Sequence, residues 1–206
     1  KRKGEILVGM ITVDLGEEIK DDNDLLEKWS KNFDCDGHYT CEIGVREGHG
    51  SKIIMDNVLN NYMHVGIDPY ANLKYQHYDN VPAYTADYTD EMRDTMLTNF
   101  REYRNQGKFR LANMTDKLFM SHPNHQDMTF AFVHFDGPHT SRDVMTEAIW
   151  FAERSAPHSR FVFDDHPKYQ MSRIAYALEL YGFVTHGMGD NKCMLAKVPK
   201  EKNEQD

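Results

Sequence analysis

Carboxylates and an imidazole follow two apolar runs in the second half of the chain. The run FAFVHF is followed by Asp136, with His139 three residues later, and the run RFVF is followed by Asp164 and Asp165. If both runs are neighbouring strands, three hard oxygen ligands meet at their ends, and such a set suits Mg²⁺. An ion held there lowers the pKa of a bound hydroxyl group. His139 titrates near neutrality and is suited to removing the remaining proton.

The same residues also have purely structural interpretations. Asp164 and Asp165 would simply cap a turn, and His139 would lie exposed at the start of a helix. His134, inside the first run, is expected to be packed or hydrogen-bonded within the sheet rather than to act as a ligand. The residue types alone therefore leave both interpretations open.

A glycine-rich turn, CEIGVREGHGS, follows an earlier apolar run. Glu42 closes that run, and Gly44, Gly48 and Gly50 would let the backbone come close to a ligand. Their spacing matches neither a dinucleotide fingerprint nor a Walker loop. A carboxylate at the strand end would repel a pyrophosphate. The turn therefore predicts a ligand with a positive charge and no phosphate, and S-adenosylmethionine has those features.

A second acidic residue, Asp68, closes the next apolar run, MHVGID. In doubly wound folds an acidic side chain roughly twenty residues after the turn binds the ribose hydroxyls. Taken alone, the turn would be a tight connection and Asp68 a helix cap. Their order and spacing together favour a nucleoside site.

These motifs need a sheet that places the strand ends side by side. Apolar runs of strand length recur, and most are separated by helix-like stretches, which predicts a parallel sheet covered by helices. The runs span residues 39–44, 63–68, 108–113, 130–136, 160–165, 182–187 and 193–198. Only a short turn separates the last two, so they must form an antiparallel hairpin. The predicted fold is α/β, a Rossmann-like three-layer sandwich with a mostly parallel seven-stranded sheet ending in that hairpin.

Helix ends are readable at two places. Thr140 and Asp143 form a capping box that starts one helix, and a second helix is expected to run from Ser172 to a stop at Gly182.

Length and composition limit the remaining possibilities. The 206 residues suffice for one well-filled core, and we expect a cap or lid at residues 1–38, the main domain at 39–199 and a disordered tail at 200–206. A net charge of -9 provides no basic surface for nucleic acid. No apolar segment reaches membrane-spanning length. Three cysteines, an odd number, favour the reducing cytoplasm. The expected partner is a small-molecule acceptor, and the sequence leaves open whether the protein forms a homo-oligomer.

Together these motifs resemble a class I S-adenosylmethionine-dependent methyltransferase over residues 39–198. EIGVREGHGS is similar to motif I of that class, with Arg46 where many members have a middle glycine. GIDPY resembles the ribose-binding strand end, and LANMTDKL resembles the segment that packs on adenine. The resemblance implies the following cofactor-binding residues: Glu42, Gly44, Arg46, Gly48, Ser51, Asp68, Asn113, Met114, Thr115 and Asp136.

Within the class, FVHFDGPHTSRD followed by RFVFDDHP resembles the metal-dependent O-methyltransferases that act on sugars of macrolides and related natural products, a methyltransferase domain 24-like group. The resemblance implies that Asp136, Asp164 and Asp165 bind a divalent ion, Mg²⁺, and that His139 is the general base. The same group includes cephalosporin hydroxylases, so it leaves the reaction open.

The expected function is therefore metal-assisted O-methylation of a small hydroxylated acceptor, with Asp136 and His139 as the catalytic residues. The alternatives are an NAD-dependent oxidoreductase on a Rossmann sheet and a nucleoside-binding module without catalysis.

Overall fold

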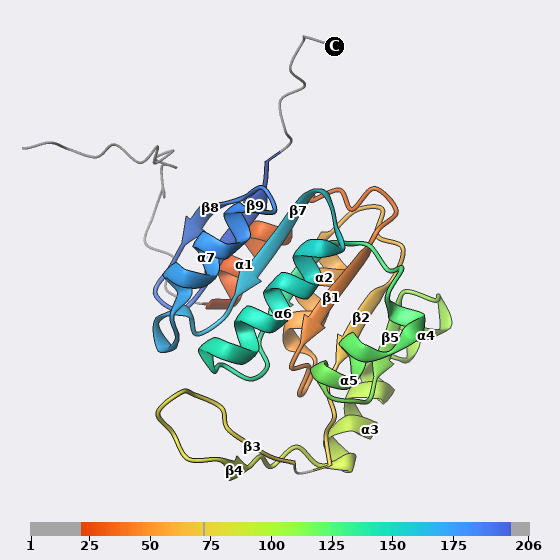
Figure 1. The fold of residues 1–206 in the computed structure, drawn as a ribbon. Coiled ribbons are helices and arrows are strands. Elements are labelled where there is room, and N and C mark those ends of the chain that lie inside the picture. Colours follow the sequence, from red (N-terminus) through yellow and green to blue (C-terminus); the bar gives the residue numbers. More distant parts are fainter. Residues whose placement is uncertain (1–21, 72, 199–206) are drawn as a thin grey trace, which may run out of the picture.

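The computed structural model describes residues 22–71 and 73–198 of the chain. Its centre is a seven-stranded sheet with the strand order β5-β2-β1-β6-β7-β9-β8 (Figure 1). The strands of this sheet are β1 (Tyr39–Ile43), β2 (His64–Ile67), β5 (Phe109–Ala112), β6 (Phe130–Phe135), β7 (Ser155–Phe163), β8 (Phe183–Met188) and β9 (Cys193–Lys197).

The strand directions agree with the sequence-based prediction. β5, β2, β1, β6 and β7 are parallel neighbours, whereas β9 runs antiparallel to both β7 and β8. Because β1 pairs with β2 on one side and with β6 on the other, the chain order reverses between β1 and β6. In open α/β sheets, ligands bind at the carboxyl ends of strands at such a switch point. The predicted mostly parallel sheet with an antiparallel finish is confirmed.

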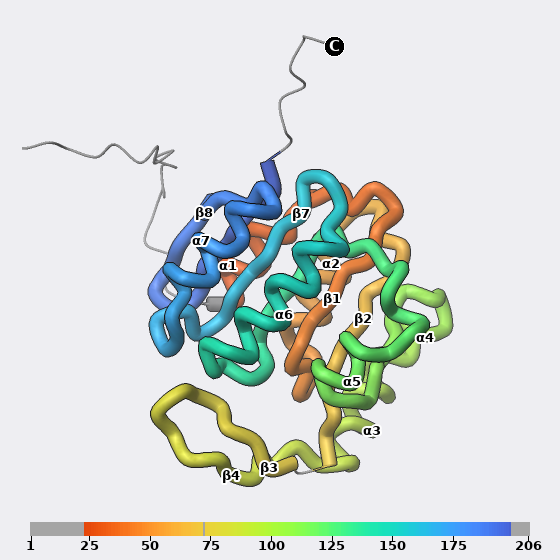
Figure 2. Tube along the Cα trace, viewed as in Figure 1, coloured from red at the N-terminus to blue at the C-terminus, as the bar shows by residue number. Residues whose placement is uncertain are grey.

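Helices cover both faces of the sheet, as Figures 1 and 2 show. The helices are α1 (Asp22–Ser30), α2 (His49–Asn57), α3 (Asp90–Asn99), α4 (Arg101–Asn105), α5 (Asp116–Ser121), α6 (Ser141–Glu153) and α7 (Met171–Glu179). On one face α5, α6 and α7 bury residues such as Phe119, Phe151 and Ile174 in the largest apolar cluster. The opposite face is covered by α1, α2 and α3. The molecule is thus a three-layer sandwich.

The described part of the predicted 1–38 cap packs tightly on the sheet. Leu26 of α1 is completely buried, and it shares an apolar cluster with Ile54 of α2 and with Phe132 and Val162 of the sheet. The helix α1 therefore contributes to the core. Residues 1–21 of the predicted cap, residue 199 and the predicted tail at 200–206 lie outside the described residues.

Two helix ends test the sequence signals. Thr140 caps α6 as predicted, because its side chain accepts a hydrogen bond from the backbone N–H of Asp143 at 3.1 Å. By contrast, α7 ends at Glu179, three residues before the predicted stop at Gly182. Gly182 instead ends the following hydrogen-bonded turn, with a φ of 85°.

After β2 the chain makes an excursion that carries the short antiparallel strands β3 (Lys74–Tyr75) and β4 (Tyr84–Thr85). We call residues 73–88 the β3–β4 excursion. Figures 1 and 2 show it in yellow, beyond the edge of the sheet at which β1 and β2 end. This position puts the excursion over the predicted site.

Candidate active site

The glycine-rich turn joins β1 to α2 at the switch point. A Cβ on Gly44 would lie 2.0 Å from the carbonyl oxygen of Asp136, and Gly44 also has a φ of 84°. Arg46 also adopts a left-handed conformation, with a φ of 50°, which glycine adopts more easily than other residues. Gly48 caps the N-terminus of α2. The loop therefore keeps the close backbone approach even though Arg46 replaces the middle glycine.

Asp68, at the end of β2, ties this loop to the sheet. Its carboxylate accepts hydrogen bonds from the backbone N–H groups of Arg46 and Tyr70, each at 2.9 Å. Only 1% of Asp68 is exposed, and burial raises its pKa. The side chain also lines a cavity. Binding of ribose by Asp68 stays a prediction, and the carboxylate already has a structural role.

A cavity of about 100 Å³ lies at the carboxyl ends of β1, β2 and β6. We call it the strand-end cavity. Strand ends supply one wall, with residues such as Ile43, Ile67 and Asp68. The β3–β4 excursion supplies another, mainly Tyr75 and Tyr88. A mostly apolar cavity with a few polar groups is typical of a small-molecule site.

The predicted cofactor residues are distributed over several places. Gly44, Asp68, Thr115 and Asp136 line the strand-end cavity, and Glu42, Gly44, Arg46 and Asp136 line an adjoining cleft of about 200 Å³. The other four lie elsewhere: Gly48 beside a hollow between α2 and α3, Asn113 beside a surface hollow next to β5, Ser51 on the buried face of α2, and Met114 against the core.

Glu42 belongs to a buried chain of hydrogen bonds under α2. One carboxylate oxygen lies 2.9 Å from His134 Nδ1, and the other accepts a hydrogen bond from the Ser51 hydroxyl. Ser51 in turn contacts His64 Nε2 at 2.9 Å, and His134 Nε2 lies 3.2 Å from the Lys192 ammonium. With only 1% of Glu42 exposed, both of its oxygens are engaged inside the protein. Its contact with a ligand stays a prediction.

The four residues predicted for chemistry meet at the ends of β6 and β7. Asp136 and Asp164 lie close enough for their carboxyl groups to interact directly. His139 lies between two carboxylates, with Nε2 3.8 Å from Asp136 Oδ1 and Nδ1 3.9 Å from Asp165 Oδ2. We call Asp136, His139, Asp164 and Asp165 the acid–base cluster.

Lys192 sets the charge balance of this cluster. Its ammonium lies 2.5 Å from Asp164 Oδ1. Burial alone would raise the pKa of Asp164, but Lys192 and His134 bring that pKa down to about 2. Partial burial and the neighbouring Asp164 carboxylate raise the pKa of Asp136, whose side chain is still 37% exposed. Asp164 is thus ionised. Asp136 has the raised pKa, so a cation bound nearby would favour its ionised form.

His139 is suited to accept a proton. Burial and the nearby His77 lower its pKa to about 4, so the ring is neutral at pH 7. Only 2% of the residue is exposed. Among the described residues, Nδ1 has no hydrogen-bond partner. Both ring nitrogens therefore lie close to carboxylates without being engaged by them.

The chain matches the profile of the methyltransferase domain family over residues 41–166. It belongs to this family. No curated protein matches the sequence significantly. The fold resembles an O-methyltransferase from Bacillus cereus in complex with SAH, with a TM-score of 0.52, 10% identity, and coverage of 86% of this chain and 78% of that chain. It also resembles the O-methyltransferase TomG from Streptomyces achromogenes, involved in tomaymycin synthesis, in complex with SAM. There the TM-score is 0.51 and the identity 12%, with 86% of this chain and 79% of that chain covered.

The predicted class I S-adenosylmethionine-dependent methyltransferase is thereby confirmed, and the family match favours it over an NAD-dependent oxidoreductase. Within residues 22–71 and 73–198, this methyltransferase has no helix with the length and apolar character that crossing a bilayer requires.

Sequence reasoning missed three residues that contact the acid–base cluster of the methyltransferase. Lys192 precedes β9, and the pairing of Phe163 with Cys193 places it beside Asp164. That register would have identified Lys192, but a sequence does not state it. His77 and Tyr78 come from the β3–β4 excursion, and the Tyr78 hydroxyl donates a hydrogen bond to Asp165 at 2.5 Å. The excursion has no periodic pattern that would have indicated them.

Proposed function

We propose that the protein transfers the methyl group of S-adenosylmethionine to a hydroxyl oxygen of a small acceptor, such as a sugar or a similar natural product, with help from a divalent metal ion. One observation carries the proposal. Asp136 lines the strand-end cavity, lies beside Asp164, and has its Oδ1 3.8 Å from His139 Nε2. A single residue thus joins the predicted cofactor cavity to the acid–base cluster.

In this proposal Asp136 and Asp164 would hold the magnesium ion, with Asp165 as the third carboxylate. All three ligands are oxygens, which Mg²⁺ prefers. Two carboxylates in contact repel each other, and this repulsion contributes to the raised pKa of Asp136. A divalent cation would relieve it. When bound, the ion would hold the acceptor oxygen and lower the pKa of its hydroxyl group.

His139 takes the proton in this proposal. Its ring is neutral and buried, and it borders Asp136 and Asp165, so an acceptor hydroxyl bound beside these carboxylates would face an imidazole that can accept a proton. Tyr75 and Tyr88 of the β3–β4 excursion line the cavity and would limit the access of water to it. Positioning of the two reactants would supply most of the acceleration.

The first prediction tests this assignment with Asp136→Asn and His139→Ala. Each variant should lower the release of S-adenosylhomocysteine, measured with a panel of polyols and glycosides, by at least about 100-fold. Calorimetry should show S-adenosylmethionine binding to His139→Ala within about threefold of the wild type. EDTA should abolish turnover, and Mg²⁺ should restore it.

The matched control is Asp127→Asn, because Asp127 is an exposed aspartate before the amino end of β6. It should leave turnover unchanged. Undiminished turnover in His139→Ala would remove that residue as the base, and turnover that survives EDTA would remove the metal. Binding of NAD in place of S-adenosylmethionine would contradict the whole proposal.

A further inference from the structure

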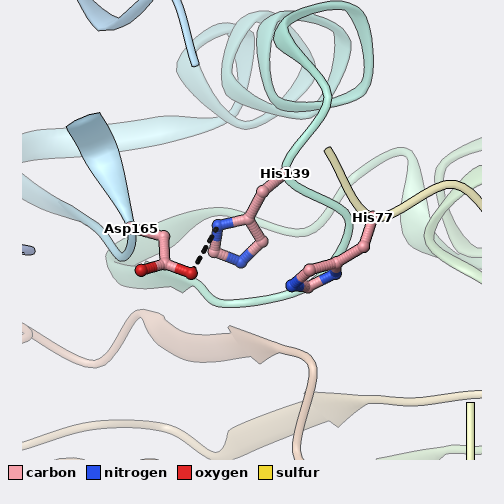
Figure 3. A group of neighbouring side chains, drawn as sticks. All are labelled: His77, His139 and Asp165. Carbon is pink, nitrogen blue, oxygen red and sulfur yellow. Dashed lines mark ion pairs between the residues drawn. The ribbon is translucent and has the colours of Figure 1, made fainter. Parts of the chain in front are cut away.

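Two histidines and an aspartate form a cluster that goes beyond the proposed mechanism. His77, His139 and Asp165 each offer one ligand atom, and these atoms lie within 4.8 Å of one another. Figure 3 shows the His139 ring between the Asp165 carboxylate and the His77 ring. The three residues come from the β3–β4 excursion, the loop before α6 and the turn after β7. Three separate segments thus converge on one point.

The two imidazoles have nitrogen atoms that the protein leaves unused. His77 Nδ1 and His139 Nδ1 are both buried, and neither has a hydrogen-bond partner within the part of the chain that the structure describes. Buried polar atoms are nearly always paired, so two unpaired ring nitrogens in contacting residues need an explanation.

The cluster is held in place by contacts that do not involve the ring nitrogens. The backbone N–H of His139 donates to the carbonyl oxygen of His77 at 2.7 Å. Asp79, two residues further on, accepts a hydrogen bond from the backbone N–H of Ser141 at 3.0 Å, at the N-terminus of α6. The Tyr78 hydroxyl orients Asp165. Such supporting contacts are typical of a site whose ligands are fixed before the ion binds.

We infer that His77, His139 and Asp165 bind a first-row divalent transition ion such as Zn²⁺ or Co²⁺. Two imidazoles and one carboxylate suit these ions, whereas Mg²⁺ prefers oxygen ligands alone. At Zn–N distances of about 2.0 Å, the ligand atoms lie about 3.3 Å apart. Small side-chain rotations would therefore close the present spacing. The site shares only Asp165 with the proposed magnesium ligands.

A consequence follows if the proposed function is correct. An imidazole that ligates a metal through one nitrogen carries its proton on the other, so His139 could no longer accept a proton. Zn²⁺ would then inhibit methyl transfer by occupying the general base.

The chain contains a matched control pair of histidines. The rings of His122 and His125 have the same 4.8 Å centroid separation as those of His77 and His139. Three of their four ring nitrogens have partners among the residues that the structure describes, however: His122 Nδ1 accepts a hydrogen bond from the backbone N–H of Asn124, and the two nitrogens of His125 contact the Phe119 carbonyl and Arg110. A variant at His122 therefore changes a histidine pair without changing the proposed site.

The test uses the full chain, freed of metal, with Co²⁺ and Zn²⁺ as probes. Calorimetry should show one Zn²⁺ site that His77→Ala, His77→Gln and Asp165→Asn each weaken by at least about tenfold. The visible absorption of bound Co²⁺ should be lost in the same variants. His122→Ala should match the wild type in both measurements, and circular dichroism checks that every variant is folded.

Unchanged Zn²⁺ affinity in folded His77→Ala or His77→Gln would overturn the inference, as would an equal loss in His122→Ala. These readouts need no turnover, so a protein without methyltransferase activity could still confirm the site. Inhibition by Zn²⁺ that His77→Ala relieves, relative to its own uninhibited rate, would connect the site to the proposed function.

Discussion

Lys192 is the residue on which the charge balance of the site depends. Its side chain is 4% exposed and contacts both Asp164 and His134. It therefore links the acid–base cluster to the buried chain of hydrogen bonds that contains Glu42. A buried ammonium between a carboxylate and an imidazole is held by its partners, and removing it leaves Asp164 uncompensated.

The second prediction is that Lys192→Met destabilises the protein by about 3 to 5 kcal/mol at pH 7, measured by urea unfolding. The control is Lys52→Met, which breaks the exposed pair with Asp56 and should cost no more than about 1 kcal/mol. Equal losses of unfolding free energy in the two variants would show that the buried Lys192–Asp164 pair stabilises the protein no more than an exposed pair does.

The pH dependence has a defined sign. The pKa of Asp164 falls from 3.8 to about 2 in the folded protein. Its contribution to stability is therefore complete above about pH 4 and is lost as the pH falls through about 2. In Lys192→Met, burial without the ammonium would raise the pKa of Asp164, so the stability difference between wild type and variant should be largest near neutral pH and should shrink as the pH falls toward 4 and below.

The loop between β1 and α2 is the element that brings the two sides of the switch point together. Gly44 lies against the Asp136 backbone, so this loop sets the position of a predicted catalytic residue as well as of the cavity wall. The element thus has a positioning role that its glycines alone do not reveal.

The third prediction separates crowding from backbone strain. Gly44 and Gly107 both have positive φ, but a Cβ on Gly44 would meet Asp136 backbone at 2.0 Å, whereas one on Gly107 would meet nothing within 4 Å. Gly107→Ala should cost about 1 to 2 kcal/mol from strain alone. Gly44→Ala should cost about 1 to 3 kcal/mol more, because Asp136 must move. Thermal unfolding and calorimetry with S-adenosylmethionine measure both effects, and similar values for the two variants would contradict the crowding argument.

Local patterns predicted the elements that position the site, because apolar strands with acidic ends, such as those before Asp68 and Asp136, are visible in a few consecutive residues. Contacts between distant elements were not predictable in this way. Lys192 reaches Asp164 through the β7–β9 register, and His77 reaches His139 through an excursion without periodicity. The burial of both Glu42 oxygens depends on where α2 packs, which no local pattern states.

Buried acidic residues on the two faces of the sheet differ in their hydrogen-bond partners. Under α2, Glu42 is compensated by His134 and Ser51. On the opposite face, Glu147 of α6 and Asp116 of α5 lie beside each other. Burial raises the pKa of both carboxyl groups, and the charge of Asp116 also raises the pKa of Glu147. Each also has a buried oxygen without a partner among the described residues. The carboxylate of Glu42 therefore has partners for both of its oxygens, whereas Glu147 and Asp116 each keep a buried oxygen without one in the described part of the chain.

The fourth prediction concerns the cost of ionising the buried Glu147 side chain. Because the folded pKa of Glu147 lies above its ordinary value of 4.5, the ionised group lowers stability at high pH, and this loss disappears as the pH falls toward 4.5. Glu147→Gln removes the charge and should raise the unfolding free energy at pH 8 by about 1 to 2 kcal/mol. The gain should shrink at pH 5. Urea unfolding at both pH values measures it, with Glu153→Gln on the exposed face of α6 as the control. A gain that did not change between pH 5 and pH 8 would mean that Glu147 binds the same number of protons in the folded and unfolded states, which would contradict a raised pKa for this residue.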